Sequence, residues 1–215
     1  GDPAVHSNRL TATETVEVRQ PQMSAISKTD QGTGRIGTGE AFNPYQVKTR
    51  NQYYRFLSSG FVHTDTMHLL FNMITFYFFG TKLERAYDQY FGTNGIYLFV
   101  FTYLAGIVVS DLKTYIKHRD NPGYNSIGAS GGVASILFAS ILYDPTSSIF
   151  LYCAICIPGF ILGGLYLIYS YFQGKKSAGR INHDAHLYGA IFGIVFTISS
   201  SSMTGSNPCV AICSE

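Results

Sequence analysis

Charged side chains are scarce in this chain, and their scarcity limits the kind of protein it can be. Aspartate, glutamate, lysine and arginine together make up 13% of its 215 residues, about half of the share typical of soluble proteins. Hydrophobic residues make up 46% and aromatic residues 15%. The formal net charge of +2 is too small to indicate a nucleic-acid partner. The composition therefore favours a membrane protein.

Cysteines are also few, with four in the whole chain. Cys153 and Cys156 lie inside an apolar run, where a thiol behaves as a small hydrophobic group. Cys209 and Cys213 lie in a short C-terminal tail. This placement lacks the pattern of a disulfide framework, so we expect no structural disulfide.

Polar and apolar residues are distributed unevenly along the chain. Residues 1–50 are rich in polar and charged side chains and lack hydrophobic periodicity, which predicts a flexible N-terminal segment. From residue 51 the sequence becomes rich in tyrosine, phenylalanine and leucine. We therefore predict a membrane domain over residues 51–202 and a polar tail over residues 203–215.

Long uncharged runs fill the predicted membrane domain, and charged residues, Asp111 among them, form the breaks between the runs. A bilayer crossing needs about 20 apolar residues, and a backbone inside a bilayer must pair its own polar groups, so each run is predicted to be a helix. Pro158-Gly159 is expected to kink or loosen the fourth helix. The predicted fold is an all-α polytopic membrane bundle. Its five visible spans cover residues 65–83, 94–112, 128–144, 148–172 and 185–202.

Ser130 stands near the start of the third span and His186 near the start of the fifth. Polar side chains at membrane depth are costly, so they are functional candidates by default. Gly189 and Gly193 share one face of the fifth span, and Gly131 gives the third span a small face, which predicts that these two helices touch. Their contact would bring Ser130 and His186 together.

His68 and Asn72 lie four residues apart on the first span and therefore share a face. Taken alone, they fit an interfacial anchor and an interhelical hydrogen bond. Together with Ser130 and His186 they indicate a shared polar pocket. A serine hydroxyl becomes nucleophilic when a neutral imidazole accepts its proton, and the tetrahedral intermediate then needs donors at its oxyanion. The Ser130 backbone N–H, the Asn72 amide and the His68 ring are candidate donors.

Three short motifs occur in order along the chain: His68-Leu69-Leu70-Phe71-Asn72, Gly128-Ala129-Ser130-Gly131, and Ala185-His186 followed by Gly189 and Gly193. His63, Tyr54-Arg55, Gly80 and Glu84-Arg85 accompany them. Over about residues 42–199, this set of residues resembles the signatures of the rhomboid family of intramembrane serine proteases.

The resemblance implies a six-helix fold with a serine–histidine dyad and no catalytic aspartate, which cuts other membrane proteins within or next to their transmembrane segments in the lipid bilayer. It makes Ser130 the nucleophile and His186 the general base and acid. It places His68, Asn72 and the Ser130 N–H around the oxyanion, with Gly128 shaping that site and His63 as the extra histidine of the oxyanion and substrate-binding group. It implies no metal or organic cofactor, and we expect a bacterial inner-membrane protein.

The chain departs from the family pattern in its helices, at one side chain and in its charges. No run in residues 1–50 could supply the family's first helix, so five spans are visible. The position four after Ser130 is often a tyrosine that packs on the catalytic imidazole, but here it is Ala134, so Tyr188 or Tyr124 is expected to support His186. The excess of lysine and arginine on one side predicts a cytoplasmic active-site mouth, whereas the family more often has the opposite orientation.

Other functions fit parts of the sequence. Gly128 to Gly132 also match the G-x-S-x-G elbow of soluble ester hydrolases, but that elbow needs a preceding strand. A metalloprotease would have to use histidines without an H-E-x-x-H motif; these are His63, His68, His183 and His186. A transporter could use intramembrane histidines as a proton path. The alternative from another functional class is a rhomboid-fold protein that binds transmembrane segments without cutting them.

Overall fold

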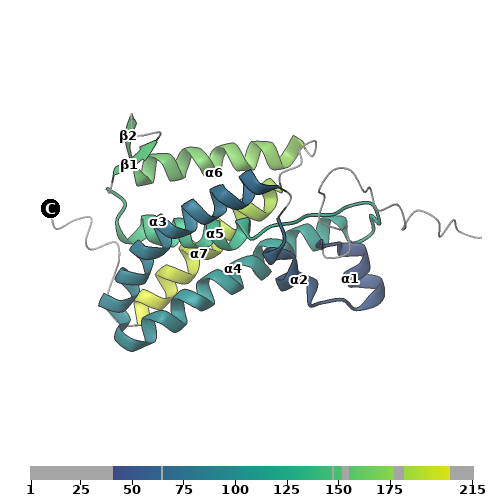
Figure 1. Cartoon of the computed structure of the whole chain (residues 1–215), viewed down its shortest axis with the longest axis horizontal. Coiled ribbons are helices and arrows are strands. Elements are labelled where there is room, and N and C mark those ends of the chain that lie inside the picture. The colour runs from purple at the N-terminus through teal and green to yellow at the C-terminus, as the bar shows by residue number, and fades with distance from the viewer. Residues whose placement is uncertain (1–40, 64, 147, 152–154, 177–181, 204–215) are drawn as a thin grey trace, which may run out of the picture. The chain divides into compact units, whose positions relative to one another are not determined.

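A computed structural model describes residues 41–63, 65–146, 148–151, 155–176 and 182–203 (Figure 1). The chain divides into two compact units, Gly1–Thr33 and Gly34–Glu215, and all the described residues belong to the second unit. Most of the predicted N-terminal segment and the predicted tail therefore lie outside the described residues. The same holds for Cys153, Cys209 and Cys213, so the absence of a disulfide stays a prediction.

The described chain is mostly helical. Helix α5 lies at the centre of the bundle, because it packs against α3, α4, α6 and α7 (Figure 1). Among the described residues, the helices ahead of α3 are the short α1 and α2, which have seven and four residues and are too short to cross a bilayer. In order, the elements are α1 (Pro44–Arg50), α2 (Arg55–Ser58), η2 (Ser59–Phe61), α3 (Thr66–Phe91), η3 (Gly92–Asn94), α4 (Gly95–His118), α5 (Ser130–Tyr143), β1 (Ser148–Leu151), β2 (Ile155–Pro158), α6 (Gly159–Lys176) and α7 (His183–Met203).

The helices predicted over residues 65–83, 94–112, 128–144 and 185–202 are confirmed as α3, α4, α5 and α7. Within the described residues, one continuous run, Thr66–His118, is long and apolar enough to cross a membrane, and it joins α3, η3 and α4. Ser130–Tyr143 and Gly159–Phe172 are shorter apolar helices.

The first part of the fourth predicted span is not helical, so the prediction over residues 148–172 is wrong there. Strands β1 and β2 form an antiparallel hairpin that pairs Ser148 with Pro158 and Leu151 with Ile155. This segment is rich in β-branched and aromatic residues, which favour strands, and an uninterrupted apolar run does not distinguish a strand from a helix. Helix α6 begins at Gly159, so Pro158-Gly159 marks the start of a helix and not a kink within one.

The segment predicted to be flexible up to residue 50 ends in helix α1. Asn43 caps this helix, since its side-chain oxygen accepts a hydrogen bond from the Gln46 amide at 2.9 Å. The Asn43 side-chain amide donates to Pro122 O at 3.2 Å. Phe42 and Ser126 exchange two backbone hydrogen bonds of 2.8 and 3.0 Å. Residues 42 and 43 are therefore attached to the loop that leads into α5.

A buried arginine holds the turn between α1 and α2. The Arg55 guanidinium donates to Ala41 O at 2.6 Å and to the side-chain oxygens of Gln52 at 2.6 Å and Gln46 at 3.2 Å. Buried charges need such hydrogen bonds, because an unpaired one is costly. The arginine of the Tyr54-Arg55 pair thus fastens the chain in front of α3.

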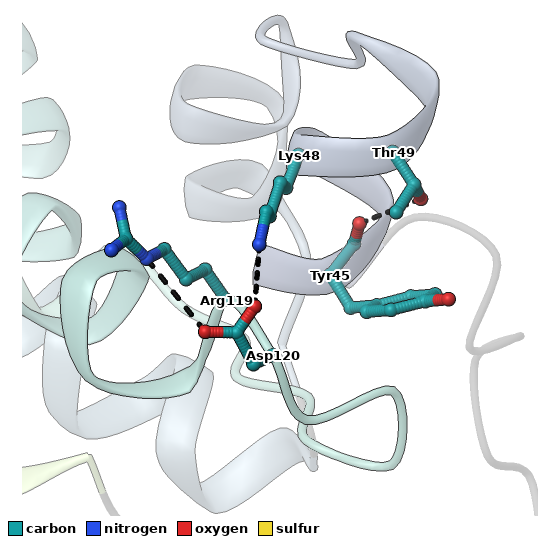
Figure 2. Close-up of polar contacts among 5 residues, drawn as sticks. All are labelled: Tyr45, Lys48, Thr49, Arg119 and Asp120. Carbon is teal, nitrogen blue, oxygen red and sulfur yellow. Dashed lines mark hydrogen bonds and ion pairs between the residues drawn. The ribbon is translucent and has the colours of Figure 1, made fainter.

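Polar contacts on the outside of this region are exposed to solvent. Lys48 Nζ lies 2.5 Å from Asp120 Oδ1, and Arg119 Nε lies 3.8 Å from Asp120 Oδ2 (Figure 2). Thr49 Oγ1 donates to the Tyr45 carbonyl at 2.8 Å within α1 (Figure 2). The Lys48 hydrogen bond lowers the pKa of Asp120 below its ordinary value. Exposed ion pairs of this kind add little to stability.

Glycines bring α5 and α7 into close backbone contact, as the sequence predicted. A Cβ on Gly189 would lie 2.2 Å from Gly131 O, and one on Gly193 would lie 2.3 Å from Ser135 O. The Ser135 hydroxyl donates across this contact to Gly189 O at 2.7 Å. Small residues and hydrogen bonds of this kind are typical of packed membrane helices.

Candidate active site

Ser130 is the first residue of α5 and follows a loop with an unusual backbone. Gly128 in this loop has φ of +124°, a conformation that residues with a side chain rarely adopt. Its amide donates to Ser59 O at 3.1 Å. A Cβ on Gly128 would lie only 2.7 Å from His68 Cε1. The loop therefore places the His68 ring beside the residues that precede Ser130.

Helix α3 presents His68 and Asn72 to this region. The Asp65 side chain caps the helix by accepting a hydrogen bond from the His68 amide at 2.8 Å. Asn72 Nδ2 is buried and has no hydrogen-bond partner among the described residues. A buried donor without a partner is costly, and each such donor in a folded protein calls for an explanation.

His63 lies in the connection between η2 and α3, and its ring meets the His68 ring edge-on with 5.6 Å between centroids. Burial, and to a lesser extent the charge of His68, lower the pKa of His63 below its ordinary value. His63 is therefore held toward its neutral form. In the part of the chain that the structure describes, no three histidine, cysteine or acidic residues are grouped so as to hold a metal ion.

The start of α7 carries His186 and is fixed to α4. Asn182 acts as its cap, with its side-chain oxygen accepting from the Ala185 amide at 3.1 Å. The Asn182 side-chain amide donates to Thr114 Oγ1 at 2.9 Å. Two residues after Asn182, Asp184 forms an ion pair of 2.7 Å with Lys117. The first turn of α7 is therefore held against the C-terminal end of α4.

The structure brings the Ser130 and His186 regions together without joining them directly. Gly131 and Gly189 lie in close backbone contact. Gly131 directly follows Ser130, and Gly189 is the third residue after His186. Between the described residues, no hydrogen bond joins Ser130 to His186. Catalytic hydrogen bonds are often long in enzymes without bound substrate, so the dyad stays a prediction.

A small pocket opens beside Ser130. Its volume of about 10 Å³ is close to the space that one water needs. Most of the side chains around it are polar. The lining residues are Ser59, Asp111, Ser126, Ile127, Gly128, Ser130, Asn182 and Ala185.

Asp111 lines this pocket, although the sequence suggested that it lay in a polar break between spans. It lies inside α4, is 8% exposed, and its carboxyl group contacts the Ser59 side chain. The prediction that Asp111 belongs to a break was wrong, because Asp111 directly precedes charged residues, including Lys113 and Lys117, that do end the span. Helical periodicity, with Thr102, Gly106, Ser110 and Thr114 also buried, was the signal that could have placed it inside.

The predicted support of His186 by Tyr188 or Tyr124 is wrong. Tyr188 lies under Lys113 Nζ, which is 5.8 Å from its ring centroid. Tyr124 stacks on His118 with 3.7 Å between centroids. A tyrosine ring that does lie beside His186 belongs to Tyr166 of α6, with a centroid distance of 6.1 Å and an interplanar angle of 22°. The His183 ring of α7 itself meets His186 edge-on at 6.0 Å. Helical side chains point according to the rotation of their helix, which the sequence does not show.

Comparison with known proteins points to one family. The family model described as Rhomboid domain matches residues 50–202. The chain is 28% identical over 144 residues to "RHOMBOID-like protein 12, mitochondrial" of Arabidopsis thaliana, which covers 62% of this chain and 42% of that protein. It is 29% identical over 112 residues to "Rhomboid protease AarA" of Providencia stuartii, which covers 47% of this chain and 38% of that protein.

These matches span less than half of each relative's length. The family model, in contrast, covers well over half of the present chain, and the matched residues include His68, Asn72, Ser130 and His186. The chain therefore belongs to the rhomboid family and has the polytopic helical membrane fold of that family.

Proposed function

We propose that the chain is an intramembrane serine endopeptidase that cleaves transmembrane segments of other membrane proteins. The observation that carries the proposal is the close backbone contact of Gly131 with Gly189, which brings the N-terminal parts of α5 and α7 together. Ser130 is the first residue of α5, and His186 lies three residues before Gly189 on α7. The relative from Providencia stuartii, which is named a protease, supports the same function.

In the proposed reaction, a neutral His186 accepts the proton of the Ser130 hydroxyl as its oxygen attacks the scissile carbonyl. The peptide bond breaks when protonated His186 gives this proton to the leaving amine. Water then attacks the acyl-enzyme, again with His186 as base, and restores Ser130. The mechanism uses no metal or organic cofactor.

Three groups are proposed to stabilise the oxyanion. The Ser130 N–H belongs to the first residue of α5, where amides have no partner within the helix. Asn72 Nδ2 is the buried donor without a partner described above. His68 lies against Gly128 and meets His63, so it is held beside the same loop. Donors set in place before the reaction stabilise the transition state without the cost of reorganisation.

The proposed partners are transmembrane proteins within a lipid bilayer, and the proposed location is a bacterial inner membrane as a multi-pass protein. The name of the plant relative places that protein in the mitochondrion. Fractionation of the source cells, with the chain detected by an antibody, tests the location.

Labelling with a fluorophosphonate probe tests the dyad in detergent-solubilised protein. We expect the unaltered chain to be labelled and both Ser130→Ala and His186→Ala to lose labelling. Ser199→Ala is a matched serine control, because Ser199 is exposed on α7 and bonds only to its own helix at Val195 O. Labelling that survives in Ser130→Ala, or that disappears in the control, would contradict the assignment.

A second candidate function is the binding of transmembrane segments without cleavage. The relative from Arabidopsis thaliana favours it, because that protein is named rhomboid-like and is not named a protease. A folded chain that binds a transmembrane peptide but neither reacts with the probe nor cleaves the peptide would establish this alternative.

A further inference from the structure

Two tyrosines of α6 face two histidines at the start of α7. The rings of Tyr166 and His186 are nearly parallel, at 22°, with 6.1 Å between centroids. One turn further along α6, the Tyr169 ring meets His183 edge-on at 5.5 Å and 84°. The two tyrosines are three residues apart on α6, and the two histidines are three residues apart on α7. The later tyrosine meets the earlier histidine, as expected for an antiparallel pair of helices. Only the Tyr166 pair has its rings face to face.

A close approach of α6 to α5 places Tyr166 there. A Cβ on Gly163 would lie 3.1 Å from Phe138 Cε1, so a larger residue there would require the Phe138 ring to shift. The Phe138 ring also contacts Tyr166, with 5.9 Å between centroids. Tyr166 is thus held between Phe138 on α5 and His186 on α7.

Ala134 leaves the space that Tyr166 uses. It is four residues after Ser130 and therefore lies on the same face of α5. It is buried in a cluster with Phe138 and Ala190, and Tyr166 packs against that cluster. A tyrosine at position 134, which the family pattern would supply, would have to occupy the volume now filled by the Tyr166 ring.

We propose that Tyr166 is the positioning residue of His186, and that α6 supplies the aromatic support which Ala134 cannot supply from α5. This proposal rests on the proposed serine protease function. A parallel ring restricts rotation of the imidazole about its χ2 bond and covers one of its faces. The ring edge, which carries both nitrogens, stays available for Ser130. The tyrosine hydroxyl takes no part in this role.

Single substitutions test the role of the ring. Tyr166→Leu should lower the rate of fluorophosphonate labelling and the kcat for a transmembrane substrate by about 3- to 10-fold, the size expected for a lost aromatic pair, with KM nearly unchanged. Tyr166→Phe keeps the ring and should retain the rate within about twofold. Tyr169→Leu is the matched control on the same helix and should also stay within about twofold. Equal losses in Tyr166→Leu and Tyr169→Leu would overturn the proposal, because they would show a general effect of α6 packing.

An exchange of positions gives a stricter test. Tyr166→Ala should lose activity, and adding Ala134→Tyr in the same chain should restore it by returning a ring to the cluster from α5. Ala134→Tyr alone should impair the protein, because two rings would compete for one space. A folded double variant that is no more active than Tyr166→Ala would contradict the proposal.

A spectroscopic readout does not depend on activity. The six histidines can be labelled with ¹³C at their ring ε1 carbons, and the His186 signal can be assigned from its loss in His186→Gln. Tyr166→Leu should remove the ring-current shift of this signal, whereas Tyr166→Phe should preserve it. If the unaltered chain proves unreactive, the protease function fails, and this measurement still decides the placement of the ring. An unchanged His186 signal in Tyr166→Leu would overturn it.

Discussion

At the scale of single residues, Gly128 is required for two reasons: its backbone conformation and the lack of space for a side chain beside His68. Its φ of +124° excludes most side chains, and a Cβ would lie 2.7 Å from His68 Cε1. Its amide also holds the loop to Ser59. The residue therefore controls both the path of the chain into Ser130 and the position of His68.

Gly128→Ala should consequently affect both stability and reactivity. We expect the free energy of unfolding to fall by about 1–3 kcal/mol because of backbone strain. The reaction with the probe should slow by roughly tenfold or more, because His68 must move. Gly123→Ala is the control in the same loop, since a Cβ there meets only Asn121 Oδ1 at an ordinary 3.5 Å. Thermal unfolding and labelling rates measure the two effects. Equal behaviour of the two variants would show that the Gly128 conformation is not needed.

The pKa of His63 predicts a pH dependence of stability. Burial and the charge of His68 lower its pKa in the folded protein below the ordinary 6.5, so the unfolded chain binds more protons in that range. The stabilisation is present above pH 6.5 and is lost as the pH falls through the lowered value. His63→Gln should therefore flatten the decline in melting temperature between about pH 7 and pH 5. An unchanged slope in the variant would mean that another group titrates there.

At the scale of elements, the contact of α5 with α7 depends on glycines, which have no side chain to keep the two helices apart. A Cβ on Gly189 would lie 2.2 Å from Gly131 O, and this neighbour is backbone that cannot rotate away. The helices could accommodate an added methyl group only by separating. Separation would move His186 away from Ser130.

Gly189→Ala should destabilise the protein by about 3 kcal/mol, the upper part of the range for overpacking, and abolish probe labelling. Gly164→Ala on α6 is the matched control, because no atom of the described residues lies within 4 Å of its added Cβ. That change should be neutral or raise stability by up to about 1 kcal/mol through higher helix propensity. Thermal melts of the purified proteins compare the two. A Gly189→Ala protein as stable as the control would contradict the close contact.

The helices and their pairing could be predicted from sequence because the relevant signals are local. Uncharged runs identify α3, α4, α5 and α7, and the spacing of Gly189 and Gly193 identifies the contact with α5. The hairpin of β1 and β2 could not be predicted, since its apolar residues fit a buried helix equally well. The start of α6 at Gly159 then became clear only from the structure.

The candidate site could be predicted in part for the same reason. Motif residues such as Ser130 and His186 are polar residues in apolar runs, which makes them visible in the sequence. Tyr166 is one of several tyrosines in an apolar helix, so its contact with His186 depends on helix rotation and tilt, which no local pattern encodes. Asp111 was hidden by the charged residues that follow it.

At the scale of the whole described molecule, the region ahead of α3 is held by buried contacts and not by its surface charges. Arg55 is 5% exposed and donates three hydrogen bonds, one of them to Ala41 O. The Lys48–Asp120 pair, by contrast, is exposed on both sides. The two interactions should therefore differ strongly in their contribution to stability.

Arg55→Leu should lower stability by about 3 kcal/mol, because it removes hydrogen bonds from a charged donor and leaves buried acceptors unpaired. Asp120→Asn, the surface control, should leave the melting temperature unchanged. Limited proteolysis near residue 41, followed by mass spectrometry, would show whether the N-terminal part detaches in Arg55→Leu. A protein that melts and resists proteolysis like the unaltered chain would show that Arg55 is dispensable.

The paired backbones of Phe42 and Ser126 give the molecule a mechanical property. Ser126 lies four residues before Ser130, and two hydrogen bonds of 2.8 and 3.0 Å connect it to Phe42. A pulling force applied to the chain ahead of Ala41 would be shared between the Arg55 bond to Ala41 O and these two bonds, which lead into the loop beside Ser130. Tension on the amino-terminal side would thus reach Ser130 along a path of only a few peptide bonds.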